Sequence, residues 1–159
     1  THYMSSTKTN DGGWPATSMR TFVNNDIYNV LPSNLKGAII DTTVVSSHGS
    51  TSGETNFTST DKLYLLAPKE IYANFSDSAD TAKELTRTLD YYKNIGVTAS
   101  NDSGTIKKNG TEDYYWWLRS ASSGDTERFF AVLSIGTVGV YHDSRASITW
   151  GVSPAFRIG

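Results

Sequence analysis

The stretch YYWWLRS, Tyr114 to Ser120, is the densest run of large apolar side chains in the chain. Successive residues of a β-strand face opposite sides, so one set should anchor the core and the other should cover a helix or line a shallow surface. Three more strand-like segments follow it: RFFAVLS, TVGVY and TWGVSPAFRI. We therefore expect a twisted antiparallel sheet in the C-terminal part of the chain.

Upstream, the pattern predicts short helices between strands. The clearest helix is TAKELTRTLDYYKNIG, which begins at Thr81, places Leu85, Leu89 and Tyr92 on one face and ends at Gly96. Helices in the N-terminal part of the chain and a sheet in the C-terminal part predict an α+β domain. The other expected elements are a helix capped by Ser18, a helix after Pro32 that ends near Gly37, strands at 38–45 and 61–67, a helical turn starting at Pro68, and loops at 46–56 and 100–113.

Composition bounds the kind of partner. The 159 residues carry a net charge of −2, contain no cysteine and show no basic stripe. No apolar run approaches the roughly 20 residues that span a bilayer. We expect a single domain, 1–159, with no nucleic-acid partner, no membrane insertion and no disulfide.

Candidates for enzyme chemistry are weak. His2, His48 and His142 lack the spacing of metal ligands. Residues 49–53, GSTSG, resemble a nucleophile elbow only loosely, because Thr51 takes the central position. The acidic pairs Glu112/Asp113 and Asp125/Glu127 are more typical of solvated charges than of an acid–base couple. The sequence predicts no catalytic residue, no metal and no cofactor.

Two motifs carry a resemblance to a known family. Residues 116–120, WWLRS, and 151–158, GVSPAFRI, resemble the WWLRSP and GVRPAxxI motifs of a bacterial and phage domain family. Between them, Ser134 to Val138 resembles that family's strand-sDG-strand hairpin. Upstream, SMRTFVNNDIYNVLP and DKLYLLAPKEI are similar to its S.iR.wLN and DkvfLLS..E segments. The resemblance implies a C-type-lectin-like fold related to the formylglycine-generating enzymes.

The departures from that family limit what the resemblance implies. Ser153 stands where the family has arginine, and Ile135 stands where its turn has an acid. Formylglycine-generating enzymes use reactive cysteines, which this chain lacks, so their oxidase activity does not carry over. The calcium-site motifs of sugar-binding lectins are also missing, which removes the support for calcium-dependent sugar binding.

Asparagine and lysine are distributed unevenly. All ten Asn and all eight Lys lie within residues 1–109. At that frequency, 18 Asn and Lys in 109 residues, the remaining 50 residues should contain about eight. Strands disfavour both residues, yet this region also contains turns where Asn is welcome. Codons for both begin with two adenines. Some C-type-lectin-like proteins are diversified by retroelements that rewrite template adenines near the 3′ end of the gene, which marks 110–159 as a candidate variable, ligand-binding region.

Rewritten Asn codons explain the large side chains that interrupt the turns of this region. Ile135, Tyr141, His142, Asp143, Arg145 and Ile148 are all possible products, whereas Trp150 needs a different parent codon. If Ile135 marks a turn, then Phe130, Val132, Val138 and Val140 should pack inward. The expected ligand-binding residues are Asp125, Phe129, Leu133, Ile135, Tyr141, His142, Asp143, Arg145, Ser147, Ile148 and Trp150.

The expected function is therefore display of a ligand-binding face, without catalysis. The ligand is a protein or glycan on a cell surface, and the domain acts outside the cell, on a virion or a bacterial surface. Three alternatives remain at this point. They are a fixed-specificity adhesion module of the same fold, a structural module that packs against neighbouring domains, and a hydrolase or oxidase on this scaffold.

Overall fold

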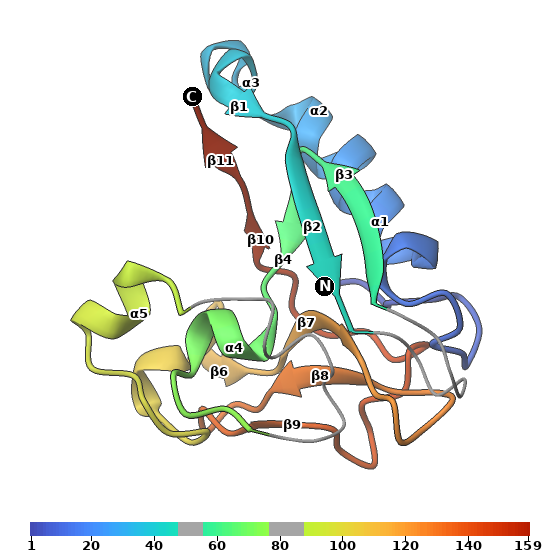
Figure 1. Ribbon diagram of the computed structural model, residues 1–159, viewed down its shortest axis with the longest axis vertical. Coiled ribbons are helices and arrows are strands. Elements are labelled where there is room, and N and C mark those ends of the chain that lie inside the picture. The colour runs from blue at the N-terminus through green and yellow to red at the C-terminus, as the bar shows by residue number, and fades with distance from the viewer. Residues whose placement is uncertain (48–55, 77–87) are drawn as a thin grey trace.

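The structure, a computed structural model, describes residues 1–47, 56–76 and 88–159. These residues form a mixed α+β arrangement, with short helices early in the chain and several small antiparallel sheets later (Figure 1). The α+β class expected from the sequence is confirmed at this level. Within the described ranges no helix has the length and apolar character needed to cross a membrane.

The first helices follow one another almost without a break. Thr17 caps α1, because its Oγ1 accepts a hydrogen bond from the backbone N–H of Arg20 at 3.1 Å; the cap therefore lies one residue before Ser18. Met19 and Val23 point into the core. The helix expected after Pro32 is confirmed. The early helical elements are η1 (Trp14–Ala16), α1 (Ser18–Phe22), the π-helical turn η2 (Val23–Ile27), α2 (Tyr28–Val30) and α3 (Ser33–Ala38).

The helix expected from Thr81 to Gly96 is shorter in its described part. Residues 77–87 lie outside the described residues. Leu89 has extended backbone, with φ −68° and ψ 142°, so α5 begins only at Asp90 and runs Asp90–Asn94. Gly96 follows its end with φ +83°, which is the left-handed conformation that glycine provides at a helix C-terminus. The other helices here are α4 (Pro68–Ile71) and η4 (Ser103–Thr105).

The C-terminal segment is shared among several sheets and does not build one sheet alone. Its last strands pair with early ones: β10 with β4 and β11 with β1. Figure 1 shows β10 and β11 rising beside β4 and β2 until the chain ends next to β1. The strands are β1 (Ile39–Ile40), β2 (Thr42–Ser46), β3 (Phe57–Asp61), β4 (Tyr64–Leu65), β5 (Lys107–Asn109), β6 (Glu112–Tyr114), β7 (Trp116–Ala121), β8 (Phe129–Val132), β9 (Val138–Gly139), β10 (Pro154–Ala155) and β11 (Arg157–Ile158).

The three-stranded sheet β7–β8–β9 lies in the middle of the core. Every residue of β7 and of β8 is buried, so both faces of these strands are covered. The inward positions of Phe130, Val132 and Val138 are confirmed, and Val140 is half-buried. Phe129 is buried as well, because the alternation between core and solvent holds only for a sheet with one solvated face.

Residues 107–114 form a hairpin, although the sequence predicted a loop over 100–113. β5 and β6 pair from Lys107 opposite Tyr114 to Asn109 opposite Glu112. Two residues connect them, and the first, Gly110, has φ +65°. This is the glycine position of a type II′ turn, whose twist suits a two-residue hairpin.

Polar side chains of the upstream motifs pair with one another inside the fold. Arg20 Nε donates to Asp61 Oδ1 at 2.6 Å. The other oxygen of the Asp61 carboxylate accepts hydrogen bonds from Trp14 Nε1 at 3.0 Å and from Ser59 Oγ at 2.7 Å. Asn24 Oδ1 accepts from the backbone N–H groups of residues 62 and 63 at 2.9 and 3.0 Å. These motifs therefore tie the first helices to the β3–β4 connection.

Arg119 of WWLRS is a second deeply buried charge among these motif residues. Its side chain is 2% exposed, and it pairs with Glu70, whose side chain is 15% exposed. The guanidinium also donates to the carbonyl of Val45 at 3.0 and 3.1 Å and to that of Leu65 at 2.9 Å. The register between β7 and β8 shifts between Trp117 and Ala121, and within this interval the N–H of Arg119 donates to the carbonyl of Leu66 at 3.0 Å.

Candidate functional site

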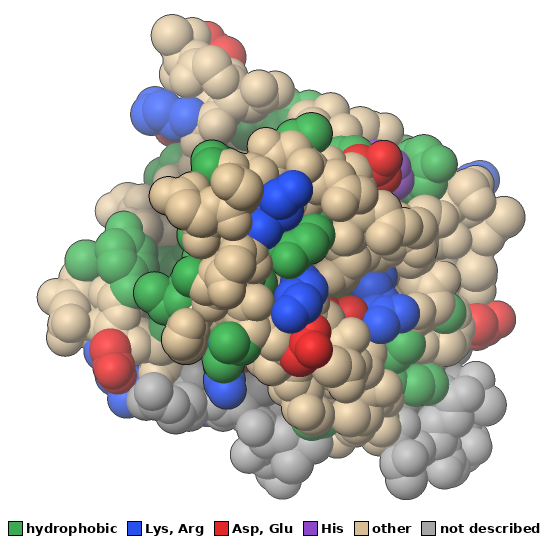
Figure 2. All heavy atoms as spheres, turned by 90° about the horizontal axis from the view of Figure 1, so that it is seen from above, with side chains coloured by type: hydrophobic (Ala, Val, Ile, Leu, Met, Phe, Trp, Pro, Cys, Tyr) green, Lys and Arg blue, Asp and Glu red, His purple; other side chains and the backbone are tan. Residues whose placement is uncertain are grey.

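The candidate site is the solvent side of the segments that flank β8, which we call the C-terminal face. Figure 2 views the molecule from the other end, above α3 and β1, where uncharged polar side chains and backbone prevail and acidic and basic groups are interspersed. The side chains that define the C-terminal face are those of Asp125, Glu127, Arg128, Tyr141, His142, Asp143, Arg145, Ser147 and Ile148.

The tip of this face is a turn from Tyr141 to Ser144. The N–H of Ser144 donates to the carbonyl of Tyr141 at 3.0 Å, and Ser144 Oγ accepts from the N–H of Tyr141 at 2.8 Å. Ser144 is fully buried, whereas the side chains of His142 and Asp143 are 82% and 83% exposed. The turn therefore holds two polar side chains in water on a fixed backbone.

A second turn follows from Arg145 to Ile148, closed by a hydrogen bond from the N–H of Ile148 to the carbonyl of Arg145 at 3.0 Å. Its Ala146 is buried and donates to the carbonyl of Glu127 at 2.8 Å, while its own carbonyl accepts from the N–H of Ser5 at 2.9 Å. Ile148 is 39% exposed. The segment is thus attached on two sides, and its large apolar group stays accessible.

Charges beside these turns are paired. Arg145 Nε lies 3.2 Å from a carboxylate oxygen of Glu127, and Arg128 pairs with Asp125. All four side chains are partly exposed. The backbones of Arg128 and Arg145 pair in an isolated antiparallel bridge. Because each arginine lies beside a carboxylate, the face carries charge of both signs.

Tyr141 lies half-buried at the inner edge of the face. Its hydroxyl is shielded from water and has no hydrogen-bond partner among the described residues. The ring packs over Gly139, where a Cβ would meet the Tyr141 hydroxyl at 3.2 Å. Burial raises the pKa of Tyr141 to about 12, so the phenol is neutral over the physiological pH range.

Ile135 is exposed but stands apart from the rest of the face. It lies in the turn that joins β8 to β9, closed by a bond from the N–H of Gly136 to the carbonyl of Leu133 at 3.0 Å. This turn follows the C-terminal end of β8, at Leu133. Glu127, which pairs with Ala146 of the face, precedes the N-terminal end of the same strand. Gly136 has φ +82° and takes the strained position of the turn, so Ile135, 62% exposed, needs no special backbone conformation.

Two residues expected on the face are inside the protein. Phe129 is fully buried, and Trp150 is 7% exposed. Trp150 packs against the rings of Tyr115 and Trp117, with centroids 5.1 and 4.5 Å away, and exchanges backbone hydrogen bonds with His2. We therefore remove Phe129 and Trp150 from the candidate site. Leu133 is half-buried beneath the β8–β9 turn.

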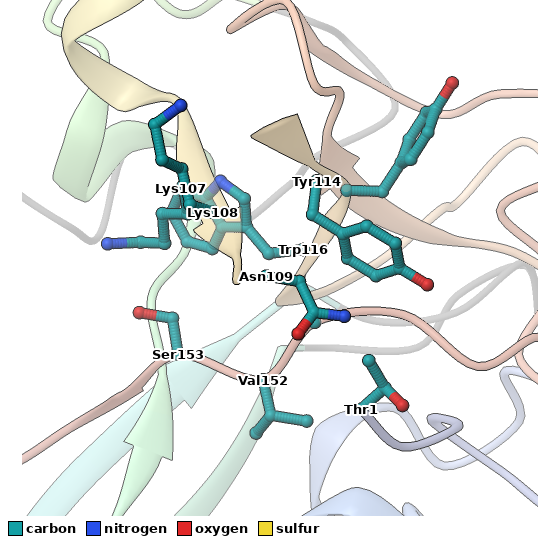
Figure 3. Close-up of a pocket in the computed structure, with 10 residues that line it drawn as sticks. Thr1, Lys107, Lys108, Asn109, Tyr114, Trp116, Val152 and Ser153 are labelled. Atoms are coloured by element: carbon teal, nitrogen blue, oxygen red, sulfur yellow. The ribbon is translucent and has the colours of Figure 1, made fainter. Parts of the chain in front are cut away.

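A pocket that the sequence did not predict lies beside the β5–β6 hairpin (Figure 3). Its volume is about 210 Å³. The pocket was missed because the sequence predicted a loop over 100–113. The Asn109-Gly110 pair between two strand-like runs is the signal that could have predicted a hairpin there. The pocket is lined by Thr1, Lys107, Lys108, Asn109, Tyr114, Tyr115, Trp116, Gly151, Val152 and Ser153.

One wall of this pocket depends on a glycine. Gly151 accepts a hydrogen bond from the N–H of Trp117 at 3.0 Å and donates one to the carbonyl of Tyr115 at 2.9 Å. A Cβ on Gly151 would lie 2.7 Å from that carbonyl oxygen, closer than real contacts allow. The glycine of GVSPA therefore lets the C-terminal segment run against β7 and bring Ser153 to the pocket.

Comparison with known proteins gives a family without an assigned role. The chain belongs to the family described as a domain of unknown function (DUF6273), whose model matches residues 1–159. Neither a curated protein nor a solved structure matches the chain.

Proposed function

We propose that this domain binds a ligand through its C-terminal face, and that a retroelement diversifies the side chains of that face. The ligand is a protein or a glycan on a cell surface. The domain acts outside the cell, on a phage virion or a bacterial surface, and it performs no catalysis and uses no cofactor.

One observation carries this proposal. Six residues are possible products of rewritten asparagine codons, and none of their side chains is buried, although Tyr141 is half-buried with its hydroxyl shielded from water. The backbone between them is held by hydrogen bonds to Glu127, Phe129 and Ser5. A fixed backbone with accessible side chains suits variation, since surface substitutions usually change stability by within about 0.5 kcal/mol. The six are Ile135, Tyr141, His142, Asp143, Arg145 and Ile148.

The chemistry of the face also favours binding. Tyrosine and arginine provide large contact areas and are enriched at the centres of interfaces. Here Tyr141 and Arg145 stand beside the exposed apolar group of Ile148 and the polar pair His142 and Asp143. Such a mixed surface can contact a protein or a glycan.

The C-type-lectin-like fold, related to that of formylglycine-generating enzymes, is part of the proposal. Its support is the set of motifs that carry the resemblance, whose residues Arg20, Asn24 and Arg119 all hold internal contacts. An experimental structure superimposed on C-type-lectin domains tests this point. A different order of strands in space would reject the fold assignment.

The diversification is tested at the gene. We expect a near-copy of the 3′ end of the coding sequence, differing mainly at adenines and followed by a reverse-transcriptase gene. If the intact locus holds no such copy, the domain has a fixed specificity, and the retroelement part of the proposal fails.

Binding is tested with the fluorescently labelled domain on a panel of intact bacterial cells. The variant combines His142→Ala, Asp143→Ala and Ile148→Ala, and its control combines three changes at exposed positions elsewhere, V30A, Y91A and I95A. We expect labelling of a subset of strains that is lost in the first variant and kept in the control. Labelling that survives the first variant, or that no strain shows, contradicts the proposal.

A further inference from the structure

Lys107 is a cation without an anionic partner in the described part of the chain. Its ammonium lies 4.8 Å from the centre of the Trp116 ring, and it forms no ion pair with any described residue. The next residue, Lys108, differs, because its ammonium lies 2.8 Å from a carboxylate oxygen of Asp113. The aromatic ring compensates Lys107 only in part, since a cation–π contact is weaker than a buried ion pair.

Desolvation of Lys107 points the same way. Burial lowers the pKa of its ammonium, which means that the site disfavours the charged form as it stands. An anion placed at this position would restore the lost stabilisation. The four-carbon stem lets the ammonium turn from the ring onto such an anion.

The side chains around Lys107 indicate which other functional groups the ligand carries. Figure 3 shows the two lysines on one side of the pocket, Tyr114 on the other and Asn109 between them, with Ser153 below the lysines. Asn109 and Ser153 have no side-chain hydrogen-bond partner among the described residues, so both are free for ligand hydroxyls.

The aromatic side chains at the pocket are held in place by the core, and Trp116, which is 1% exposed, lies beneath its surface. Trp116 Nε1 donates to the carbonyl of Thr105 at 3.1 Å, which fixes the indole. Tyr115 stacks on the buried Trp150 at 5.1 Å. A volume of about 210 Å³ is below the ~300–1,000 Å³ of most drug-sized sites, so the pocket accommodates a single ring or the end of a larger molecule.

We propose that this pocket binds a carboxylate-bearing sugar residue, with Lys107 on the carboxylate, Asn109 and Ser153 on ring hydroxyls and the accessible rings of Tyr114 and Tyr115 on the ring face. The combination of a cation, hydroxyl partners and aromatic surface matches an acidic monosaccharide at the end of a glycan. This site lies outside the C-terminal face and does not depend on its function.

The test is a titration of the ¹⁵N-labelled domain followed by NMR, with methyl glucuronide as the probe and methyl glucoside and acetate as comparisons. We expect saturable shifts at the Trp116 indole N–H and at the amides of Gly151 and Ser153. The glucoside, which lacks the carboxylate, should bind about tenfold more weakly, the order expected for one charge-assisted hydrogen bond. Acetate should also bind more weakly than the glucuronide.

Substitutions complete the test. Lys107→Gln should weaken glucuronide binding about tenfold, whereas Lys93→Gln, an equal change of charge on α5, should leave it unchanged. Should K107Q fail to fold, Asn109→Ala at the exposed hairpin end must weaken binding in its place. The inference is overturned if glucoside or acetate binds as well as glucuronide, if no probe binds, or if the shifts map to residues 141–148. The triple variant of the C-terminal face should keep glucuronide binding, so the two proposals fail separately.

Discussion

Replacing Arg119 with methionine tests the internal pairing on which the fold depends. The change removes the guanidinium that pairs with Glu70 and leaves the carbonyls of Val45 and Leu65 without their guanidinium donors. Glu70 keeps the hydrogen bond from the N–H of Ala67 at 2.8 Å. Breaking a buried ion pair by removing one partner typically costs about 3–5 kcal/mol.

This cost is large relative to the stability of a domain of this size, which is about 5–15 kcal/mol. At about 2–4 °C per kcal/mol, Arg119→Met should lower the melting temperature by about 6–20 °C. Urea denaturation followed by circular dichroism measures the free energy of unfolding directly. The matched control is Lys108→Met, which breaks an exposed ion pair with Asp113 and should cost less than about 1 kcal/mol.

A second change separates the effect of charge from that of packing. If an uncompensated Glu70 causes the loss, then adding Glu70→Gln to Arg119→Met should recover part of the stability. The reasoning is refuted if R119M unfolds within about 1 kcal/mol of the wild type, or if the double variant is less stable than R119M alone.

Three further predictions concern other internal contacts. Gly136→Ala should destabilise the domain by about 2 kcal/mol or more, because φ is +82° and a Cβ would lie 2.1 Å from a backbone oxygen. The control Gly37→Ala, at a position on α3 with open space around it, should instead stabilise the domain by about 0.5–1 kcal/mol. Equal effects of the two changes in urea denaturation would contradict this. Asn10→Ala removes an amide that donates to three carbonyls at 2.6–3.0 Å and should cost about 1–3 kcal/mol, and an unchanged melting temperature would show that water replaces it. Burial raises the pKa of Tyr92 and of Tyr141 from 10.0 to about 12. Their contribution to stability should therefore be full below pH 10 and lost as the pH rises from 10 through 12. An ultraviolet titration in which every tyrosine ionises near pH 10 would refute this.

The order of the elements could be predicted from the sequence because local signals mark it. Pro68 begins α4 as expected, and Gly96 ends α5. The motif residues Arg20, Asn24 and Arg119 hold internal contacts, but their partners could not be predicted from the sequence. Arg119 and Glu70 are 49 residues apart, and their contact depends on how β7 crosses β4, which no local pattern records.

The errors in the predicted site have a common physical cause. Periodicity tells which residues alternate, but it does not tell whether one or both sides of a sheet are covered. Because β8 is buried on both sides, Phe129 joins the core, and Trp150 is drawn inside by its aromatic neighbours. The turn residues His142, Asp143 and Ile148 could be placed in solvent from the sequence, since turns lie at the surface. The pocket beside Lys107 could not, because Gly151 and Ser153 reach it from a distant segment.

The central claim is that residues 125–149 combine a fixed core with side chains that can vary. Saturation mutagenesis of this segment, with protease resistance of the displayed domain as the measure of folding, tests it most directly. Positions 135, 141, 142, 143, 145 and 148 should accept most substitutions, whereas the buried Phe129, Phe130, Ala131, Val132, Ser144 and Ala146 should accept few. Equal intolerance at both sets would contradict the account, because the C-terminal face could then not change its side chains without unfolding.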